Sequence, residues 1–282
     1  MISVIKPVKY LRHILILFVL LSMASATEKT PVERPDWARN LQKWGFSSDT
    51  TEQIIEAAKN QKNSIVRYNA LGLLIERIGD KAIPYLREAL DDPEFSVRRR
   101  AAEWLGSFGN KSGVEQMRKD FKTFAPNDGM PPDIDPNITD PREIKKQEGQ
   151  RFLRIHNALL AAMILADQGD RSGYKLAAVV VMEDRNIIHR VFGVRILVEI
   201  AKADPATLQA EGLDPVSVLC SVAKSEKQEF VLNMLIARVS ENLHDETALK
   251  ILEIVQKSSN APESVRRSAK STIERIQGKE II

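Results

Sequence analysis

The stretch GDKAIPYLREALDDPEFSVRRRAAEWLGSFGN, residues 79–110, shows the architecture most clearly. Val97, Ala101 and Leu105 stand four residues apart, a spacing that places them on one face of an α-helix. Before that helix, Asp92 supplies a capping carboxylate, and the proline that follows it suits a first helical turn. The stretch therefore predicts two helices joined by a tight turn, with a shared apolar face that must be buried.

The same spacing recurs along the chain, which indicates a repeat protein built from stacked helix pairs. The clear copies are Val66, Arg67, Ala70, Leu74 and Gly79; Val97, Arg98, Ala101, Leu105 and Gly109; and Val265, Arg266, Ala269, Ile273 and Ile276. Weaker copies are His189, Arg190, Gly193 and Leu197; Asn157, Ala161, Ala162, Leu165 and Gly169; and Val231, Leu235 and Val239.

The pattern predicts an all-α fold of about six helix pairs with no convincing strand. Three consecutive valines within 177–182 favour a strand locally, but the helical copies on both sides outweigh that preference. We expect helices over Thr51–Asn60 with Ser64–Ile78, Lys81–Leu90 with Glu94–Phe108, Gly113–Thr123 with Gly149–Ala166, Ser172–Glu183 with Ile187–Lys202, Asp214–Lys224 with Gln228–Leu243, and Thr247–Lys257 with Pro262–Gln277.

These phrases, together with APESVRRSAKSTIERI at 261–276, resemble HEAT repeats of the short sort of roughly 30 residues, also found in phycobilin-lyase-type proteins. The resemblance implies a right-handed α-α superhelix whose second helices line a concave face, used as a scaffold for protein interaction. It also implies a structural ladder of arginines that pair with acidic residues near the preceding turn, with Asp91 or Asp92 as the expected partner of Arg98. The alternative role for this arginine slot is ligand binding. The ladder comprises Arg67, Arg98, Arg190 and Arg266.

The amino terminus has the three-part layout of a secretory signal. Basic side chains up to Arg12 precede an apolar run from Ile14 to Met23, and a small-residue triplet ends at Ala26. This predicts a signal peptide over 1–26, cleaved between Ala26 and Thr27, and export to the periplasm or the outside. An uncleaved anchor is the alternative, but the run is about half the roughly 20 residues that span a bilayer.

The remaining chain divides into a cap segment at 27–48, a solenoid at 49–277 and a tail at 278–282. Residues 1–26 hold three basic and no acidic side chains, so the 41 basic and 38 acidic residues of the chain become 38 of each. A neutral mature chain lacks the electrostatic footprint of a nucleic-acid binder, and we expect no membrane span once the signal is removed.

An insertion rich in proline and aspartate, residues 124–148, interrupts the third pair and predicts a long loop. It carries alternating oxygen ligands reminiscent of a calcium loop, but isoleucines stand where that loop needs its glycine and its glutamate. A solvated acidic turn is therefore favoured over a calcium site. The candidate ligands are Asp133, Asp135, Asn137 and Asp140.

The separate histidines and the one cysteine form no recognisable catalytic arrangement in the sequence. His156, His189 and His244 belong to different repeats and no pair has metal-ligand spacing within a helix, so core or surface roles are expected. His156 and His189 are hypothesised to share the concave face, since both lie on second helices. Cys220 is expected to be a small buried hydrophobe. The sequence predicts no enzyme, no cofactor and no metal centre.

Other features also favour a scaffold. Trp37 and Trp44 are expected to cap the first pair, with an aromatic ligand platform as the alternative. The arginines at 98–100 should point in three directions around their helix, with Glu94 and Glu103 in reach. We expect an unidentified protein partner, with the oligomeric state left open. The alternative function is a tetrapyrrole-like small-molecule binder or a lyase-type enzyme, and a structural part of an envelope assembly is a third possibility.

Overall fold

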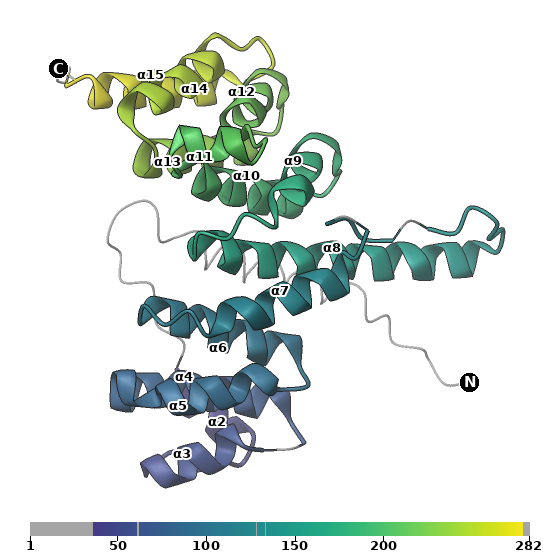
Figure 1. Ribbon diagram of the computed structural model, residues 1–282, viewed down its shortest axis with the longest axis vertical. Coiled ribbons are helices and arrows are strands. Elements are labelled where there is room, and N and C mark those ends of the chain that lie inside the picture. Colours follow the sequence, from purple (N-terminus) through teal and green to yellow (C-terminus); the bar gives the residue numbers. More distant parts are fainter. Residues whose placement is uncertain (1–35, 61, 128, 133, 279–282) are drawn as a thin grey trace. The chain divides into compact units, whose positions relative to one another are not determined.

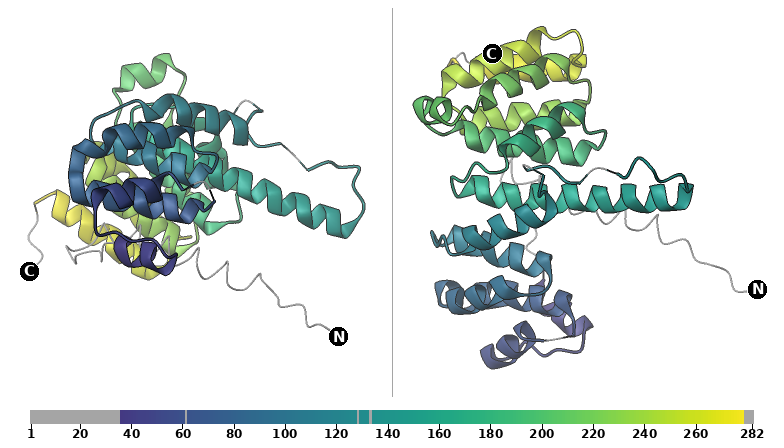
Figure 2. Two further views of the ribbon diagram at one scale, coloured as in Figure 1. Left: turned by 90° about the horizontal axis from the view of Figure 1, so that it is seen from below. Right: turned by 45° about the vertical axis from the view of Figure 1, so that its right-hand side comes forward.

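The computed structural model describes residues 36–60, 62–127, 129–132 and 134–278 of the chain. Contacts group Trp37–Ile282 into one compact unit. Within the described ranges the regular structure is helical, and β pairing is limited to one isolated bridge between Asn127 and Met130. Helix pairs follow one another and stack, which confirms the predicted all-α superhelix (Figures 1 and 2).

The helices alternate between two layers, and each helix of the second layer contacts the next one along the stack. The first layer holds α3 (Thr51–Ala58), α5 (Ile83–Glu88), α7 (Gly113–Phe124), α9 (Tyr174–Glu183), α12 (Pro215–Ser225) and α14 (Asp245–Lys257). The second layer holds α4 (Ser64–Ile78), α6 (Phe95–Ser107), α8 (Pro141–Asp167), α10 (Ile187–Ala201), α13 (Glu229–Asn242) and α15 (Glu263–Ile276). Short elements complete the stack: α2 (Trp37–Lys43), α11 (Pro205–Ala210), and the 3-10 turns η2 (Gly79–Ala82) and η3 (Ala89–Asp91).

The repeated valine slot of the second helices forms the centre of the core. Val66, Val97, Val231 and Val265 are each 0% exposed. Burying a side chain of this size stabilises the fold by roughly 1.5–3 kcal/mol relative to leaving it in water. The apolar spacing read from the sequence therefore does correspond to one continuous interior.

Glycines at the starts of first helices allow adjacent repeats to approach closely. A Cβ atom on Gly113 would lie 2.7 Å from both Cα and Cβ of Ala102. A Cβ on Gly173 would likewise collide with Ala162, which holds the corresponding place on α8. Glycine is thus required because the start of one pair rests directly on the second helix of the pair before it.

The insertion in the third pair is shorter than predicted. Helix α8 begins at Pro141 and not at Gly149, which leaves 125–140 as the loop. The reason is local: the Asp140 side chain accepts a hydrogen bond from the Arg142 backbone N at 2.9 Å, and Pro141 fills the first helical position. The first turns of α8 consequently extend past the neighbouring helices (Figure 1).

Two other boundaries differ from the prediction. Helix α11 was not predicted, although Asp204 caps it by accepting from the Thr207 N at 3.0 Å and Pro205 opens it. The predicted helix over 81–90 is divided, because η2 and η3 flank the short α5. In contrast, the valine-rich segment 177–182 lies within α9, so the prediction of a helix there is confirmed.

The amino-terminal cap uses one tryptophan of the predicted two. Trp37 is 7% exposed and packs on α4 where Gly72 leaves room, since a Cβ there would lie 2.7 Å from the indole. Trp44 is 50% exposed, so its predicted burial was wrong. The chain leaves α2 before it, and Gly45 turns the backbone with φ of 78°.

Two terminal predictions fall largely outside the described residues: the leader at 1–26 with its cleavage site between Ala26 and Thr27, and the tail after Gly278. In the part of the chain that the structure does describe, no helix combines the length and apolarity needed to cross a bilayer.

Candidate functional site

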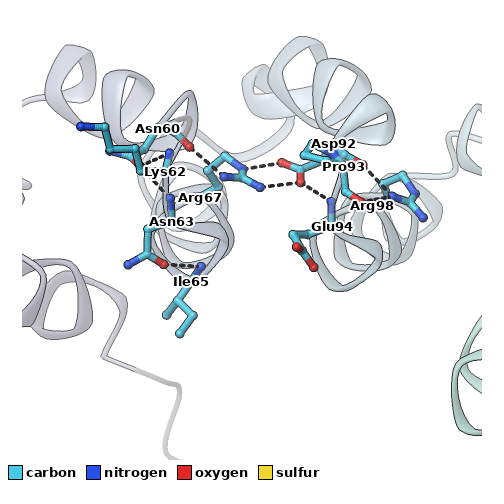
Figure 3. A network of polar contacts seen from close by, with 9 residues as sticks. All are labelled: Asn60, Lys62, Asn63, Ile65, Arg67, Asp92, Pro93, Glu94 and Arg98. Atoms are coloured by element: carbon cyan, nitrogen blue, oxygen red, sulfur yellow. Dashed lines mark hydrogen bonds and ion pairs between the residues drawn. The ribbon is translucent and has the colours of Figure 1, made fainter. Parts of the chain in front are cut away.

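The arginine slot of the repeat joins neighbouring pairs. In α4, Arg67 donates from Nε and Nη2 to the two carboxylate oxygens of Asp92, at 2.5 and 2.7 Å, and from Nη1 to the Asn60 carbonyl at 2.8 Å (Figure 3). Asp92 also accepts from the Glu94 backbone N at 2.8 Å. Arg67 and Asp92 are both almost fully buried, and the hydrogen bond to Asp92 is the main cause that raises the pKa of Arg67 above its ordinary value.

The next arginine pairs differently from the prediction. Arg98 was expected to pair with the carboxylate of Asp91 or Asp92, but its Nη2 donates to Asp120 in α7 at 2.6 Å. Arg98 contacts Asp92 only through the backbone, donating from Nη1 to the Asp92 carbonyl at 2.7 Å. The prediction failed because Asp92 is already taken by Arg67 of the preceding pair.

The two remaining arginines of the ladder also form ion pairs, and the last of these pairs is the most exposed. Arg190 forms an ion pair with Glu226, which stands just before α13. Arg266 pairs with Glu263 within its own helix at 2.6 Å, and both side chains are more than one-third exposed. The buried pairs therefore connect one repeat to the next, whereas the last one is local.

An aromatic group lies where α2, α4 and α6 meet. The ring centroids of Trp37, Tyr68 and Trp104 are 5.9 to 6.4 Å apart. The guanidinium of Arg100 lies over all three, 4.6 Å from the Trp104 centroid, and its Nη1 donates to Glu103 at 2.8 Å. Such stacking on ring faces holds this arginine in one place.

Two histidines meet on α8 and α10, as hypothesised for second helices. The rings of His156 and His189 have centroids 5.7 Å apart, and Phe152 stacks on His189 at 4.6 Å. His189 is 1% exposed, and its Nδ1 is 2.9 Å from an Asp184 oxygen. Burial, together with the nearby His189 and Arg99, lowers the pKa of His156 to about 4.

Alternating charges continue from these histidines along the same helices. Arg195 of α10 donates to Asp167 of α8 at 2.9 Å. Burial raises the pKa of Asp167, although the charge of Arg195 opposes this effect. Burial and the charge of Arg195 together lower the pKa of Arg238 on α13, whose Nε has no hydrogen-bond partner.

These polar groups act on one another across helices. Burial alone would raise the pKa of Glu103, but the charges of Arg100, Arg99 and Arg195, with the hydrogen bond from Arg100, hold it below its ordinary value. Ion pairs join Glu103 to Arg99 and Arg100 on α6, and Asp167 of α8 to Arg195 of α10. Because α6, α8, α10 and α13 contact one another in sequence, we call the charged and imidazole groups on these helices the second-helix strip. It comprises Arg99, Glu103, His156, Asp167, Arg195 and Arg238.

Sequence reasoning found only part of the strip. The histidines were hypothesised to share a face, but Arg99 and Arg100 were expected only to find Glu94 or Glu103 as exposed partners. Both do pair with Glu103, at 3.5 and 2.8 Å. Charged residues recur at i, i+3 and i, i+4 spacing on successive second helices, and this spacing could have indicated the strip from the sequence.

The described calcium candidates Asp135, Asn137 and Asp140 make local hydrogen bonds in the loop and at the start of α8. Asp135 accepts from the Asn137 backbone N at 2.9 Å and side-chain Nδ2 at 3.0 Å, while Asp140 caps α8. Asp133 lies outside the described residues. Across the described ranges, no group of three or more His, Cys, Asp or Glu side chains is placed to hold a metal ion.

Two other predicted residues lie apart from the strip. Cys220 on α12 is partly buried, and that burial raises the pKa of its thiol, so it is a poor nucleophile at neutral pH. His244 precedes α14 and lines a small depression with Lys202 and Glu241.

An open groove of about 310 Å³ lies at the first-layer side, between the first two pairs. Its walls include Tyr85 and Pro93, and Lys59 and Glu88 form an exposed ion pair at 3.1 Å among its lining residues. The buried groups that it reaches, Arg67 and Asp92, already satisfy each other, so the groove offers a ligand little polar recognition.

Comparison with known proteins agrees with the repeat architecture. Residues 51–120 match the family described as HEAT repeats, which confirms the resemblance drawn from the sequence. Among solved structures, the chain is similar to the complex of CpcE and CpcF of phycocyanin lyase from Nostoc sp. PCC7120, with 15% sequence identity and a TM-score of 0.37, over 92% of this chain and 94% of that chain. No curated protein matches the chain.

Proposed function

We propose that this chain, which contains HEAT repeats, is an exported, non-catalytic scaffold that binds a protein partner along the second-helix strip. The observation that carries the proposal is the continuity of the strip, which runs across four successive second helices with charges of both signs. A surface that extends over several repeats suits a protein partner better than a small ligand, which one pocket would enclose.

The charges of the strip favour recognition by complementarity. Arg195 and Arg238 lie near each other, and burial lowers the pKa of Arg238, so an acidic group on a partner would relieve their mutual repulsion. Glu103 is 42% exposed and can accept from a basic group of the same partner. Alternating charges of this kind set register and exclude partners with a mismatched pattern.

Export rests on the leader. Basic residues, a short apolar run and a small-residue triplet ending at Ala26 support removal of 1–26 by a signal peptidase. Sequencing the amino terminus of the protein isolated from its native host tests this point, and the expected first residue is Thr27. Retention of Met1 would contradict export by cleavage.

Site-specific photo-crosslinking in the native host tests the binding surface. A photoreactive amino acid at position 103 or 195 is expected to give the same protein adduct, because both positions lie on the strip. Control positions Glu115 and Lys257 are exposed on first-layer helices and should give no such adduct.

The adducts also distinguish the competing functions. Adducts that form equally at the control positions would contradict a specific strip. If no protein adduct formed and the purified chain instead carried a coloured compound, the tetrapyrrole-like binder would replace the scaffold. Charge reversal by Arg195→Glu should remove the adduct at position 103 without unfolding the protein, because Arg195 is one-third exposed.

A further inference from the structure

His189 occupies a place in the repeat that normally holds an aliphatic side chain. The same slot carries Val66, Val97, Val231 and Val265, all 0% exposed. His189 is 1% exposed, so an imidazole with two polar nitrogens lies in the apolar row. Burial of a polar ring at such a slot is unfavourable unless both nitrogens find partners.

One nitrogen of His189 has a partner and the other has none. Nδ1 lies 2.9 Å from an Asp184 carboxylate oxygen. The other ring nitrogen, Nε2, is buried without a hydrogen-bond partner.

A second unsatisfied imidazole stands beside it. Nδ1 of His156, on the adjacent helix α8, is also buried without a partner. The two ring centroids are 5.7 Å apart. Two imidazoles that each bind one metal ion at about 2.1 Å have centroids roughly 5 to 6 Å apart, so the spacing suits a shared ion.

We propose that His156 and His189 bind a divalent cation of the Zn²⁺ type, with Asp184 orienting His189 from behind. A carboxylate on the far nitrogen of a ligating histidine fixes the ring and makes its free nitrogen a better ligand. The two histidines supply two nitrogens only, since no larger ligand group occurs within the described ranges. Water completes the coordination of an ion that is held by these two buried nitrogens.

The positive charge of a neighbouring arginine should weaken cation binding by the two histidines. The charge of Arg99 acts on His156 and opposes a second cation there. Glu103 offsets part of this charge through its ion pair with Arg99 at 3.5 Å. Replacing the arginine by a neutral residue, as in Arg99→Gln, should therefore tighten cation binding, an effect that a merely structural histidine pair would not show.

Calorimetric titration of the untagged full-length chain with Zn²⁺ tests the proposal without any partner. We expect one site, at least tenfold weaker binding in His189→Val and His156→Gln, and unchanged binding in the matched control His244→Gln. His189→Val places in the slot the residue that other repeats carry, so its helical circular dichroism should match that of the parent chain.

Visible absorption of Co²⁺ in place of Zn²⁺ reports nitrogen coordination directly, and its intensity should fall in the same two variants. Absence of a zinc site in the parent chain would overturn the proposal, and so would a site that persists in both His189→Val and His156→Gln. Weaker rather than tighter binding in Arg99→Gln would equally contradict it. Because the assay uses the isolated chain, its failure leaves the proposed protein scaffold untouched.

Discussion

The ion pair between Arg67 and Asp92 should contribute far more to stability than the pair at the end of the stack. In Asp92→Ala, Arg67 loses two charge-assisted hydrogen bonds at 2.5 and 2.7 Å and keeps the one to the Asn60 carbonyl. The Glu94 backbone N also loses its acceptor. Removing one partner of a buried ion pair costs about 3–5 kcal/mol, because the other charge stays buried without compensation.

The matched control is Glu263→Ala, which removes the corresponding carboxylate from Arg266. That pair joins two side chains that are 37% and 64% exposed, and it spans three residues of one helix. Exposed pairs of this kind contribute about 0–1 kcal/mol. Both variants remove a carboxylate that receives an arginine, but only Asp92 is buried, accepts two bonds from its arginine and also accepts from a backbone N.

Urea unfolding followed by circular dichroism measures both variants. Asp92→Ala should lower the free energy of unfolding several-fold more than Glu263→Ala. It should also broaden the transition, because in a solenoid each repeat is stabilised mainly by its neighbours. Equal and small losses in the two variants would show that the buried ladder does not join the repeats energetically.

Three other perturbations give specific expectations. Gly72→Ala should destabilise the fold by about 1–2 kcal/mol, because the added Cβ would lie 2.7 Å from the Trp37 ring. Urea unfolding monitored by tryptophan fluorescence measures this loss, and a gain in stability would show that the indole moves freely. Since the fold depresses the pKa of His156 from 6.5 to about 4, its neutral form is favoured, and stability should fall by up to about 3 kcal/mol as pH decreases through that window. His156→Phe should flatten this part of the stability profile, and an unchanged slope would contradict the cause. Deleting 126–148 while keeping Phe124, whose ring packs edge-to-face on Phe95, should leave cooperative helical unfolding measured by circular dichroism. Collapse of the transition would show that the insertion is part of the core.

The fold was readable from the sequence because its determinants are local. Val97 and its equivalents repeat at helical spacing, and Asp92 and Pro93 precede the second helix of the second pair. The same Asp-Pro signal occurs at Asp140 and Asp204, where it was not used, so the early start of α8 and the short α11 were missed. In the first case the many prolines and aspartates of 124–148 were taken to predict a loop over the whole segment, although Asp140 and Pro141 begin a helix within it.

The candidate site was harder to predict from the sequence than the fold, because it depends on which side chains of different helices meet. Sequence spacing placed His156 and His189 on second helices, and the two rings do lie close together, but His189 is buried in the core row and not on the hypothesised concave face. The spacing could not show unpartnered ring nitrogens. It gave Arg98 a partner from the preceding turn, whereas the structure shows Asp120 of α7. Such pairings depend on how neighbouring repeats are positioned relative to each other, which the pattern of buried positions does not fix.

The ladder has a consistent geometry where the repeats are regular. Asp92, Asp184 and Glu226 each stand three residues before a second helix, namely α6, α10 and α13. Arg67 of the preceding second helix reaches Asp92, and Arg190 reaches Glu226 in the same way. An acid at this position therefore receives the arginine of the repeat before it.

The third pair departs from that rule, and this departure accounts for the pairing of His189 with Asp184. At the arginine slot of α8 stands Ala158, which is fully buried and cannot reach Asp184. Asp184 thus lacks the arginine of the preceding repeat, and it pairs with His189 of its own repeat instead. An alanine at the arginine slot of α8 thus occurs together with a histidine at the valine slot of α10, and the histidine supplies the partner that Asp184 does not receive from α8. This pairing satisfies Asp184 but leaves Nε2 of His189 buried without a hydrogen-bond partner.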